Sequence, residues 1–389
     1  MPAVSNAREI LLVTNDLGPR AGGIETFILG LLDFLDGKNL VIYTSSEEDP
    51  LEDEKFDKAL ADKYGVIVIR DRAKVLLPTP RVTRAVVEVM KEYHAQTIWF
   101  GATAPLAFMS PALRKAGATR IVGLTHGHEV WWSKLFPFTW AMRRIGKSVD
   151  ALTYLGDFTR TAMQKAVGTH PDLVRIAPGI SISHFTPGQK PIDLLQKYDL
   201  VGKPVIISVG RLVHRKGQDR LIQALPEILR SVPDAVLVFV GEGPRKPYME
   251  KLIAKYSLSA HIRFVGRVSY ADLPRYIRMG DLFAMPSRSR FFGLEVEGLG
   301  IVYLEASACG LPVLVGASGG APDAVLPDVT GSVVDGNDLH AIARETIAFL
   351  SDLPRAKSMG EAGRNWAERE WSWEIWGKRF AELLSPSDS

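Results

Sequence analysis

One arrangement occurs twice in this chain and constrains its fold more than any other feature. The apolar run Ile10–Thr14 precedes a turn-rich, glycine-bearing loop, and residues 24–35 then carry apolar side chains at helical 3/4 spacing. The same order returns with the apolar run Val205–Val209, the polar loop 210–217 and an apolar stripe over 221–229. Each half of the chain therefore opens with a strand, a loop and a helix.

Further β-rich runs alternate with helical stretches in both halves. They are 66–69, 97–100, 120–124, 235–241, 262–266, 282–286 and 311–316. This alternation predicts the α/β class, with two Rossmann-like parallel sheets that meet at the Pro- and Gly-rich stretch 177–203. Ligands of open parallel sheets bind beyond the carboxyl ends of the strands, so we expect a site in a cleft lined by loops 15–23 and 210–217.

The composition, with 46% apolar and 23% charged residues among 389, is that of an ordinary globular protein. A net charge of +3 argues against a general nucleic-acid binder, and no nucleic-acid partner is expected. The one cysteine, Cys309, excludes an internal disulfide and fits a cytoplasmic location. No signal peptide is evident, and no apolar run approaches the roughly 20 residues that cross a bilayer, so any membrane contact is expected to be peripheral.

The loop 210–217 places several cations between a strand and a helix. A guanidinium, an ammonium and the amide groups of a helix N-terminus suit a diphosphate, and Arg211 and Lys216 are the favoured pair. A solvated basic loop is the alternative. The position at a strand end, where such sheets bind anions, favours the diphosphate.

Two glutamates, Glu297 and Glu305, flank a glycine-bearing stretch. If Glu297 stands at a helix entrance and Glu305 two turns further on, the helical rotation between them is about 80°, and both carboxylates address one ligand. Spacing alone favours ordinary surface acids on a helix. Gly298 and Gly300 let backbone approach a ligand closely, which adds support to the interpretation that the two glutamates share a ligand.

His126 and His128 follow the predicted strand 120–124. Because no third ligand accompanies them, we expect no metal there, but a hydrogen-bonding or proton-handling role for His126 and a structural one for His128. No two aspartates stand at i and i+2, so the metal-holding Asp-x-Asp pair of many sugar-nucleotide enzymes is absent and side-chain cations must replace it. A Gly-x-Gly-x-x-Gly motif and a P-loop are also absent, and no cofactor is expected.

With these residues in place, the chain resembles the retaining glycosyltransferases of the GT-B fold, in the family marked by a Glu-x7-Glu pair. It is most similar to the actinobacterial members that use GDP-mannose to mannosylate phosphatidylinositol mannosides. The similarity covers nearly the whole chain. Its most specific stretches are 12–16, 99–101, 125–130, 211–213, 215–219, 283–286, 295–306 and 318–322.

The resemblance implies an N-terminal acceptor domain (1–180), a C-terminal donor domain (181–372) and a return helix (373–389) that packs on the first domain. Trp366, Trp371, Trp373 and Trp376 are interpreted as one helical segment of packing anchors. For the donor, it implies these contacts: Gly23 near the phosphates, Arg211 and Lys216 on the diphosphate, Glu297 on the sugar, Glu305 on the ribose hydroxyls and the backbone at Val268 on the base. His126 would lie beside the sugar, and Asp16 would contact the acceptor.

The implied activity is transfer of mannose from GDP-mannose to an inositol hydroxyl of a lipid-linked phosphatidylinositol mannoside, with retention and without metal, at the inner face of the cell membrane. His126, Arg211, Lys216 and Glu297 would be catalytic. The alternatives are another donor such as a UDP-sugar, a diacylglycerol-linked sugar acceptor, a sugar-nucleotide epimerase, and a nucleotide-binding protein without turnover.

The chain departs from the family at Phe291-Phe292, at Ser181, where relatives carry an aspartate, and in the aromatic stretch that follows Val130. These differences bear on the acceptor more than on the donor. The aromatic and basic segment 131–147 is expected to dock on an anionic membrane surface. Inward packing of its aromatic rings is the alternative.

Overall fold

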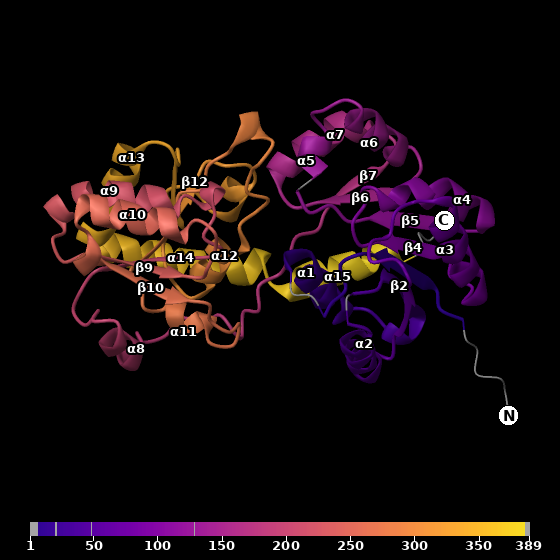
Figure 1. Ribbon diagram of the computed structural model, residues 1–389, viewed down its shortest axis with the longest axis horizontal. Helices are drawn as coiled ribbons and strands as arrows, with labels where there is room; N and C mark the ends of the chain where they lie inside the picture. The colour runs from indigo at the N-terminus through magenta and orange to yellow at the C-terminus, as the bar shows by residue number, and fades with distance from the viewer. Residues whose placement is uncertain (1–6, 20–21, 48, 128, 386–389) are drawn as a thin grey trace. The chain divides into compact units, whose positions relative to one another are not determined.

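The computed structural model describes residues 7–19, 22–47, 49–127 and 129–385 (Figure 1). The chain divides into two compact units, one formed by residues 1–179 and 373–389 and the other by residues 180–372. Each unit is built on one parallel sheet.

The first unit holds a seven-stranded sheet in the spatial order β3-β2-β1-β4-β5-β6-β7. The strands are β1 Ile10–Thr14, β2 Leu40–Ser45, β3 Ile67–Asp71, β4 Thr97–Phe100, β5 Arg120–Gly123, β6 Ala151–Tyr154 and β7 Asp172–Arg175. The helices are α1 Gly23–Leu32, α2 Pro50–Tyr64, α3 Pro80–Glu92, α4 Ser110–Ala116, α5 Glu129–Trp132, α6 Phe138–Gly146, α7 Asp157–Val167 and α15 Trp373–Leu384, with 3₁₀ turns Gly37–Asn39 and Leu106–Met109.

Local sequence determines where these helices begin. The side chains of Asp49 and Thr79 accept hydrogen bonds from backbone N–H groups in the first turns of α2 and α3, and a proline occupies the first position of each helix. Strand β2 is buried along its whole length, as expected of a parallel strand covered on both faces.

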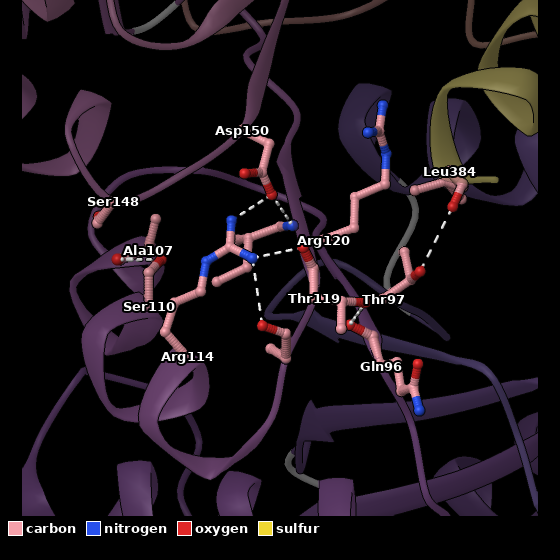
Figure 2. Close-up of polar contacts among 12 residues, drawn as sticks. Gln96, Thr97, Ala107, Ser110, Arg114, Thr119, Arg120, Ser148, Asp150 and Leu384 are labelled. Atoms are coloured by element: carbon pink, nitrogen blue, oxygen red, sulfur yellow. Dashed lines mark hydrogen bonds and ion pairs between the residues drawn. The ribbon is translucent and has the colours of Figure 1, made fainter. Parts of the chain in front are cut away.

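The last helix of the chain, α15, packs on the first unit. A Cβ on Gly30 of α1 would lie 2.3 Å from the ring of Trp373, so the glycine makes room for that indole. Trp99 of β4 meets Phe380 edge to face at 4.8 Å. Thr97 Oγ1 donates to the Leu384 carbonyl at 3.4 Å, and Figure 2 also draws the Arg114–Asp150 ion pair, which joins α4 to the residue before β6. The predicted return crossing is thereby confirmed.

The sequence predicted one helix for the four C-terminal tryptophans. In the structure they lie in two helices and in the short segment between them. Trp366 lies in α14, within the second unit, and its ring meets Trp371 edge to face at 5.5 Å. Trp373 and Trp376 belong to α15 in the first unit. All four are anchors, but two serve each unit.

The second unit holds a six-stranded sheet in the order β10-β9-β8-β11-β12-β13. The strands are β8 Val205–Val209, β9 Val236–Val240, β10 Ile262–Gly266, β11 Leu282–Met285, β12 Val313–Gly316 and β13 Gly331–Val334. The helices are α8 Ile192–Lys197, α9 Gln218–Ser231, α10 Lys246–Tyr256, α11 Leu273–Ile277, α12 Ile301–Ala308, α13 Leu339–Ser351 and α14 Leu353–Glu370, with 3₁₀ turns His214–Lys216, Ser259–His261, Phe291–Gly293 and Ala321–Ala324. Figure 1 shows α9 and α10 together near α13, and apolar residues of all three join the core against the sheet.

Both sheets run in the same order when their strands are counted along the chain, with the first strand between the second and the fourth. The connection direction reverses there, which is where such sheets bind ligands at their carboxyl edge. The predicted α/β class with two Rossmann-like sheets is confirmed. Strands β2, β6, β7 and β13 were not predicted. The last three have four residues each, and apolar runs this short cannot be told from buried helical turns by periodicity.

Candidate functional site

Charged side chains gather at the reversal point of the second sheet, between β8 and β11. Lys216 closes the turn that follows β8, and its Nζ lies 2.9 Å from Glu297 Oε2. Arg215 Nη1 lies 2.5 Å from the same oxygen. Burial raises the pKa of Glu297, but the two cations outweigh burial and hold that pKa below its ordinary value. Glu297 is therefore an ionised carboxylate held by two cations.

Glu305, in α12, is the second buried carboxylate of this site. Its side chain has no hydrogen-bond or ion-pair partner among the described residues, and it is only 7% exposed. Burial raises its pKa to about 7, and the nearby charge of Lys216 offsets only part of that rise. A buried carboxylate without a partner is costly in a folded protein, and it is the kind of group that a polar ligand satisfies.

The sequence predicted that the two glutamates lie on one helix. The structure shows that they do not. Helix α12 begins only at Ile301, after Gly300 with a left-handed φ of 77°, so Glu297 lies in the preceding loop. Its backbone is held by the segment after β12: the Glu297 N–H donates to Ser318 Oγ at 3.3 Å, and its carbonyl accepts from the Gly320 N–H at 2.9 Å. Lys216, rather than a shared helix, relates the two acids.

Arg211 stands apart from this cluster. Its side chain is exposed and makes no ion pair among the described residues, whereas the predicted partner Lys216 is buried. The cation that accompanies Lys216 on Glu297 is Arg215, which sequence reasoning missed. Its signals were its place next to Lys216 in a basic loop and at the start of the family-specific stretch 215–219.

Val268 follows β10 at the same edge of the sheet and is half-buried. A cavity of about 510 Å³ opens nearby, at the carboxyl ends of β9 and β10. Its lining is 241–244, Lys246, Pro247 and 264–266. The aromatic ring of Phe264 and the Lys246 ammonium in this lining suit a flat heterocycle.

The first-unit candidates lie at the carboxyl edge of their own sheet. Asp16 follows β1, where its N–H donates to Thr14 Oγ1 at 3.0 Å, and Gly23 begins α1 with open space beside its Cα. His126 follows β5: Nε2 lies 2.6 Å from the Gly101 carbonyl, and the ring meets Phe27 edge to face at 5.7 Å. Because a carbonyl only accepts, Nε2 carries the proton, which leaves Nδ1 as the acceptor of the neutral ring.

The remaining predictions concern His128, the binding of a metal ion and the departure from the family at Phe291. His128 lies outside the described residues. Among the residues that the structure does describe, no three His, Cys, Asp or Glu side chains cluster in a way that could hold a metal ion. Phe291 is 61% exposed, and the Arg290 guanidinium lies 4.6 Å from its ring centroid.

Comparisons with known proteins identify the family of this chain. The model of the glycosyl transferases group 1 matches residues 193–366, and that of glycosyltransferase family 4 matches residues 21–184. A GDP-mannose-dependent alpha-(1-6)-phosphatidylinositol monomannoside mannosyltransferase of Mycolicibacterium smegmatis is 43% identical over 97% of this chain and 98% of its own. A Corynebacterium glutamicum enzyme, named for the monoacylated form of that acceptor, is 41% identical over 98% of this chain and 99% of its own.

Solved structures share the fold at low sequence identity. HepE of Anabaena, in complex with UDP, matches with a TM-score of 0.78 and 20% identity over 97% of this chain and 99% of its own. Sucrose-phosphate synthase of Thermosynechococcus elongatus matches with a TM-score of 0.77 and 21% identity over 97% and 98%. Together with the full-length relatives, these matches show that this chain belongs to the group 1 glycosyltransferases and has the GT-B fold.

Proposed function

We propose that this chain transfers mannose from GDP-mannose to an inositol hydroxyl of phosphatidylinositol monomannoside, with retention of configuration. The observation that carries the proposal is the position of Lys216 beside two buried carboxylates, one paired and the other without a partner among the described residues. The donor and acceptor are supported by the full-length relatives, whose names state both.

In this proposal the second unit binds the donor. Arg211 and Lys216 bind the diphosphate, Glu297 contacts the sugar, and Glu305 accepts hydrogen bonds from the ribose hydroxyls. The base takes the cavity near Val268. As the bond between mannose C1 and the phosphate oxygen breaks, the cations stabilise the negative charge that develops on GDP, without a metal ion.

The first unit binds the acceptor. Asp16 contacts it, His126 lies beside the sugar, and Gly23 lets backbone approach the donor phosphates. The acceptor oxygen bonds to C1 on the face from which GDP departs, and its proton passes to the departing phosphate oxygen. One carbon–oxygen bond forms as another breaks, so no carboxylate nucleophile is required.

The test is incubation with GDP-mannose and phosphatidylinositol monomannoside, with GDP release and lipid mass followed together. We expect both to rise, and only when the lipid is present. GDP-mannose converted to another sugar nucleotide without lipid would indicate an epimerase, and GDP binding without turnover would indicate an idle binder. UDP-glucose and ADP-glucose serve as donor controls.

We propose further that the enzyme reaches its lipid from the inner face of the cell membrane. No helix among the described residues is long and apolar enough to span a bilayer. Segment 131–147 divides in two. Trp131, Trp132 and Phe138 form a cluster with centroid distances of 4.7–5.5 Å, whereas Phe136 is 85% and Trp140 57% exposed.

The Arg144 guanidinium lies 5.8 Å from the Trp140 ring centroid, and Arg143 and Lys147 are exposed further along the same segment. Aromatic rings suit the headgroup region, and each basic residue near an anionic surface contributes about 1 kcal/mol. The test is co-sedimentation of Arg143→Glu/Arg144→Glu with anionic and neutral vesicles. We expect weaker binding to anionic vesicles only. The matched control is Lys55→Glu/Lys58→Glu, which changes charge equally on α2 and should bind like wild type. A folded Arg143→Glu/Arg144→Glu variant that binds as wild type does would exclude this surface.

A further inference from the structure

A buried ion pair adjoins the turn that carries Arg215 and Lys216. Arg288 Nη2 donates to Asp219 Oδ2 at 2.8 Å, and the two side chains are 3% and 4% exposed. Asp219 lies in the first turn of α9, and Arg288 lies in the loop after β11. Removing one partner of so buried a pair leaves the other charge uncompensated, so the two residues hold each other in place.

Arg288 also contacts the turn itself, through its backbone and through its side chain. Its backbone N–H donates to the Arg215 carbonyl at 2.8 Å. Its guanidinium lies against the His214 ring, with Nε 3.2 Å from Nδ1 and Nη2 3.0 Å from Nε2. Burial, and then the charge of Arg288, lower the pKa of His214 below its ordinary value, which keeps the ring neutral and able to accept from the guanidinium.

The residue after the turn restricts it further. Gly217 has a left-handed φ of 74°, and a Cβ there would lie 1.9 Å from the Pro286 carbonyl oxygen, so the turn packs directly on the loop after β11. The side chains of Arg215 and Lys216 leave the same turn and meet Glu297. The orientation of both cations therefore depends on a turn held by Arg288.

We propose that Arg288, anchored by Asp219, is a positioning residue that holds the Arg215–Lys216 turn in the orientation that receives a nucleoside diphosphate. This inference rests on the proposed function of the site. Arg288 and Asp219 act through Lys216 and need not touch the substrate. Displacement of a group by a change remote from the chemistry costs as much as about 100-fold in rate.

The test is a double-mutant cycle in the full-length protein. Asp219→Asn is made in the wild type and in Lys216→Met, and kcat and KM for GDP-mannose and the Kd of GDP by calorimetry are measured for all four proteins. We expect Asp219→Asn to lower kcat/KM by about 10- to 100-fold in the wild type and by less than about 3-fold in Lys216→Met. Equal losses in the two backgrounds, or no loss in the wild type, would overturn the proposal.

Two further variants guard against a purely structural explanation. Arg245→Gln removes another cation near Asp219, 3.4 Å away, whose side chain does not bond the turn, and it should keep kcat/KM within about 3-fold of wild type. A loss there equal to that of Asp219→Asn would contradict the proposal. Where Asp219→Asn does not fold, Arg288→Lys takes its place in the cycle, because the ammonium keeps the charge but cannot reproduce the planar contact with His214.

GDP binding separates this inference from the proposed function. A wild type that binds GDP but does not mannosylate the lipid refutes the transfer reaction, while the Kd cycle still tests positioning. A wild type that is active, with an Asp219→Asn variant of equal Kd and kcat, refutes positioning alone. A wild type that does not bind GDP refutes both.

Discussion

The two units have sheets of the same strand order, yet the edges where ligands bind differ in charge. At the edge of the second unit, Lys216, Arg215 and Glu297 lie within ion-pair distance, with Glu305 buried nearby. At the edge of the first unit, the described candidates are His126 and Asp16. The same scaffold thus presents two cations on one carboxylate in the second unit, and in the first unit a histidine whose backbone N–H donates to the buried Glu129 at 2.9 Å.

The first unit also uses an arginine near its first loop, but for a structural purpose. Arg70 Nη2 donates to the Gly18 carbonyl at 2.9 Å, and its guanidinium is paired with Asp53 and Asp57 at 2.8 and 2.7 Å. Two carboxylates thereby neutralise the cation next to the loop. In the second unit, Lys216 faces one carboxylate that Arg215 also neutralises. The difference favours the second unit as the diphosphate site of the proposed reaction.

The largest expected effect comes from removing the cations of the second unit. Arg211→Ala and Lys216→Ala should each cost about 2 to 4 kcal/mol of transition-state stabilisation, the range for losing one preorganised donor. Steady-state kcat/KM with GDP-mannose measures this. Lys203→Ala, which removes a half-buried lysine whose ion pair among the described residues is with Asp199, is the control and should be neutral. Wild-type turnover in both site variants would refute their assignment.

The next effect is on stability and separates Glu305 from the ionised acids. Its pKa rises from an ordinary 4.5 to about 7 on folding, so between these values the native state binds more protons than the unfolded state. The contribution of Glu305 to the stability of the folded protein is therefore present at low pH and lost as pH rises through about 7. Glu305→Gln should therefore gain stability on wild type between pH 4.5 and 8, by up to about 3 kcal/mol. The free energies of unfolding of the two proteins are measured by urea denaturation across this range. A difference between them that stays constant with pH would contradict the raised pKa of Glu305.

A third prediction divides the two glutamates by ligand. Glu305→Ala should weaken binding of GDP by about 0.5 to 1.5 kcal/mol, the net value of a typical hydrogen bond, because the ribose contacts are lost. Glu297→Ala should leave GDP binding unchanged and weaken only GDP-mannose. Calorimetry with both ligands decides this, and equal effects of each variant on the two ligands would count against separate roles.

A smaller effect on binding is expected in the first unit. His126→Ala should leave the Kd of GDP within about 2-fold of wild type while lowering the rate of mannosyl transfer to the lipid by about 100-fold. Phe27→Leu alters the ring that packs on His126 but keeps the imidazole, and serves as the packing control. If His126→Ala weakened GDP as strongly as Lys216→Ala does, the division of roles between the units would be wrong.

Chelation should have no effect. Side-chain cations take the role that a divalent ion plays beside an Asp-x-Asp pair, so turnover should be equal with and without EDTA. The measurement is GDP release after dialysis against EDTA. Loss of activity that magnesium or manganese restores would refute the proposed metal-free reaction.

The fold was readable from the sequence because the strand–loop–helix order is local. Runs 97–100 and 262–266 coincide with β4 and β10, and 282–286 exceeds β11 by one residue. Lys216, Glu297 and Glu305 were singled out by position and spacing. Their relation was not, because Gly300 ends the loop and starts the helix later than the pattern suggested. The Arg288–Asp219 pair joins residues 69 apart, and only tertiary packing brings them together.

The return of α15 has a consequence for how the protein is made. The ring of Phe380 covers the fully buried Trp99, and Trp373 fills the space that Gly30 leaves open. Domains generally fold in order as they leave the ribosome. Here the unit that begins the chain lacks its final helix until translation has passed the whole of the other unit. The second unit can therefore complete its fold first, while apolar surface on the first unit stays uncovered until Trp373–Leu384 have been synthesised.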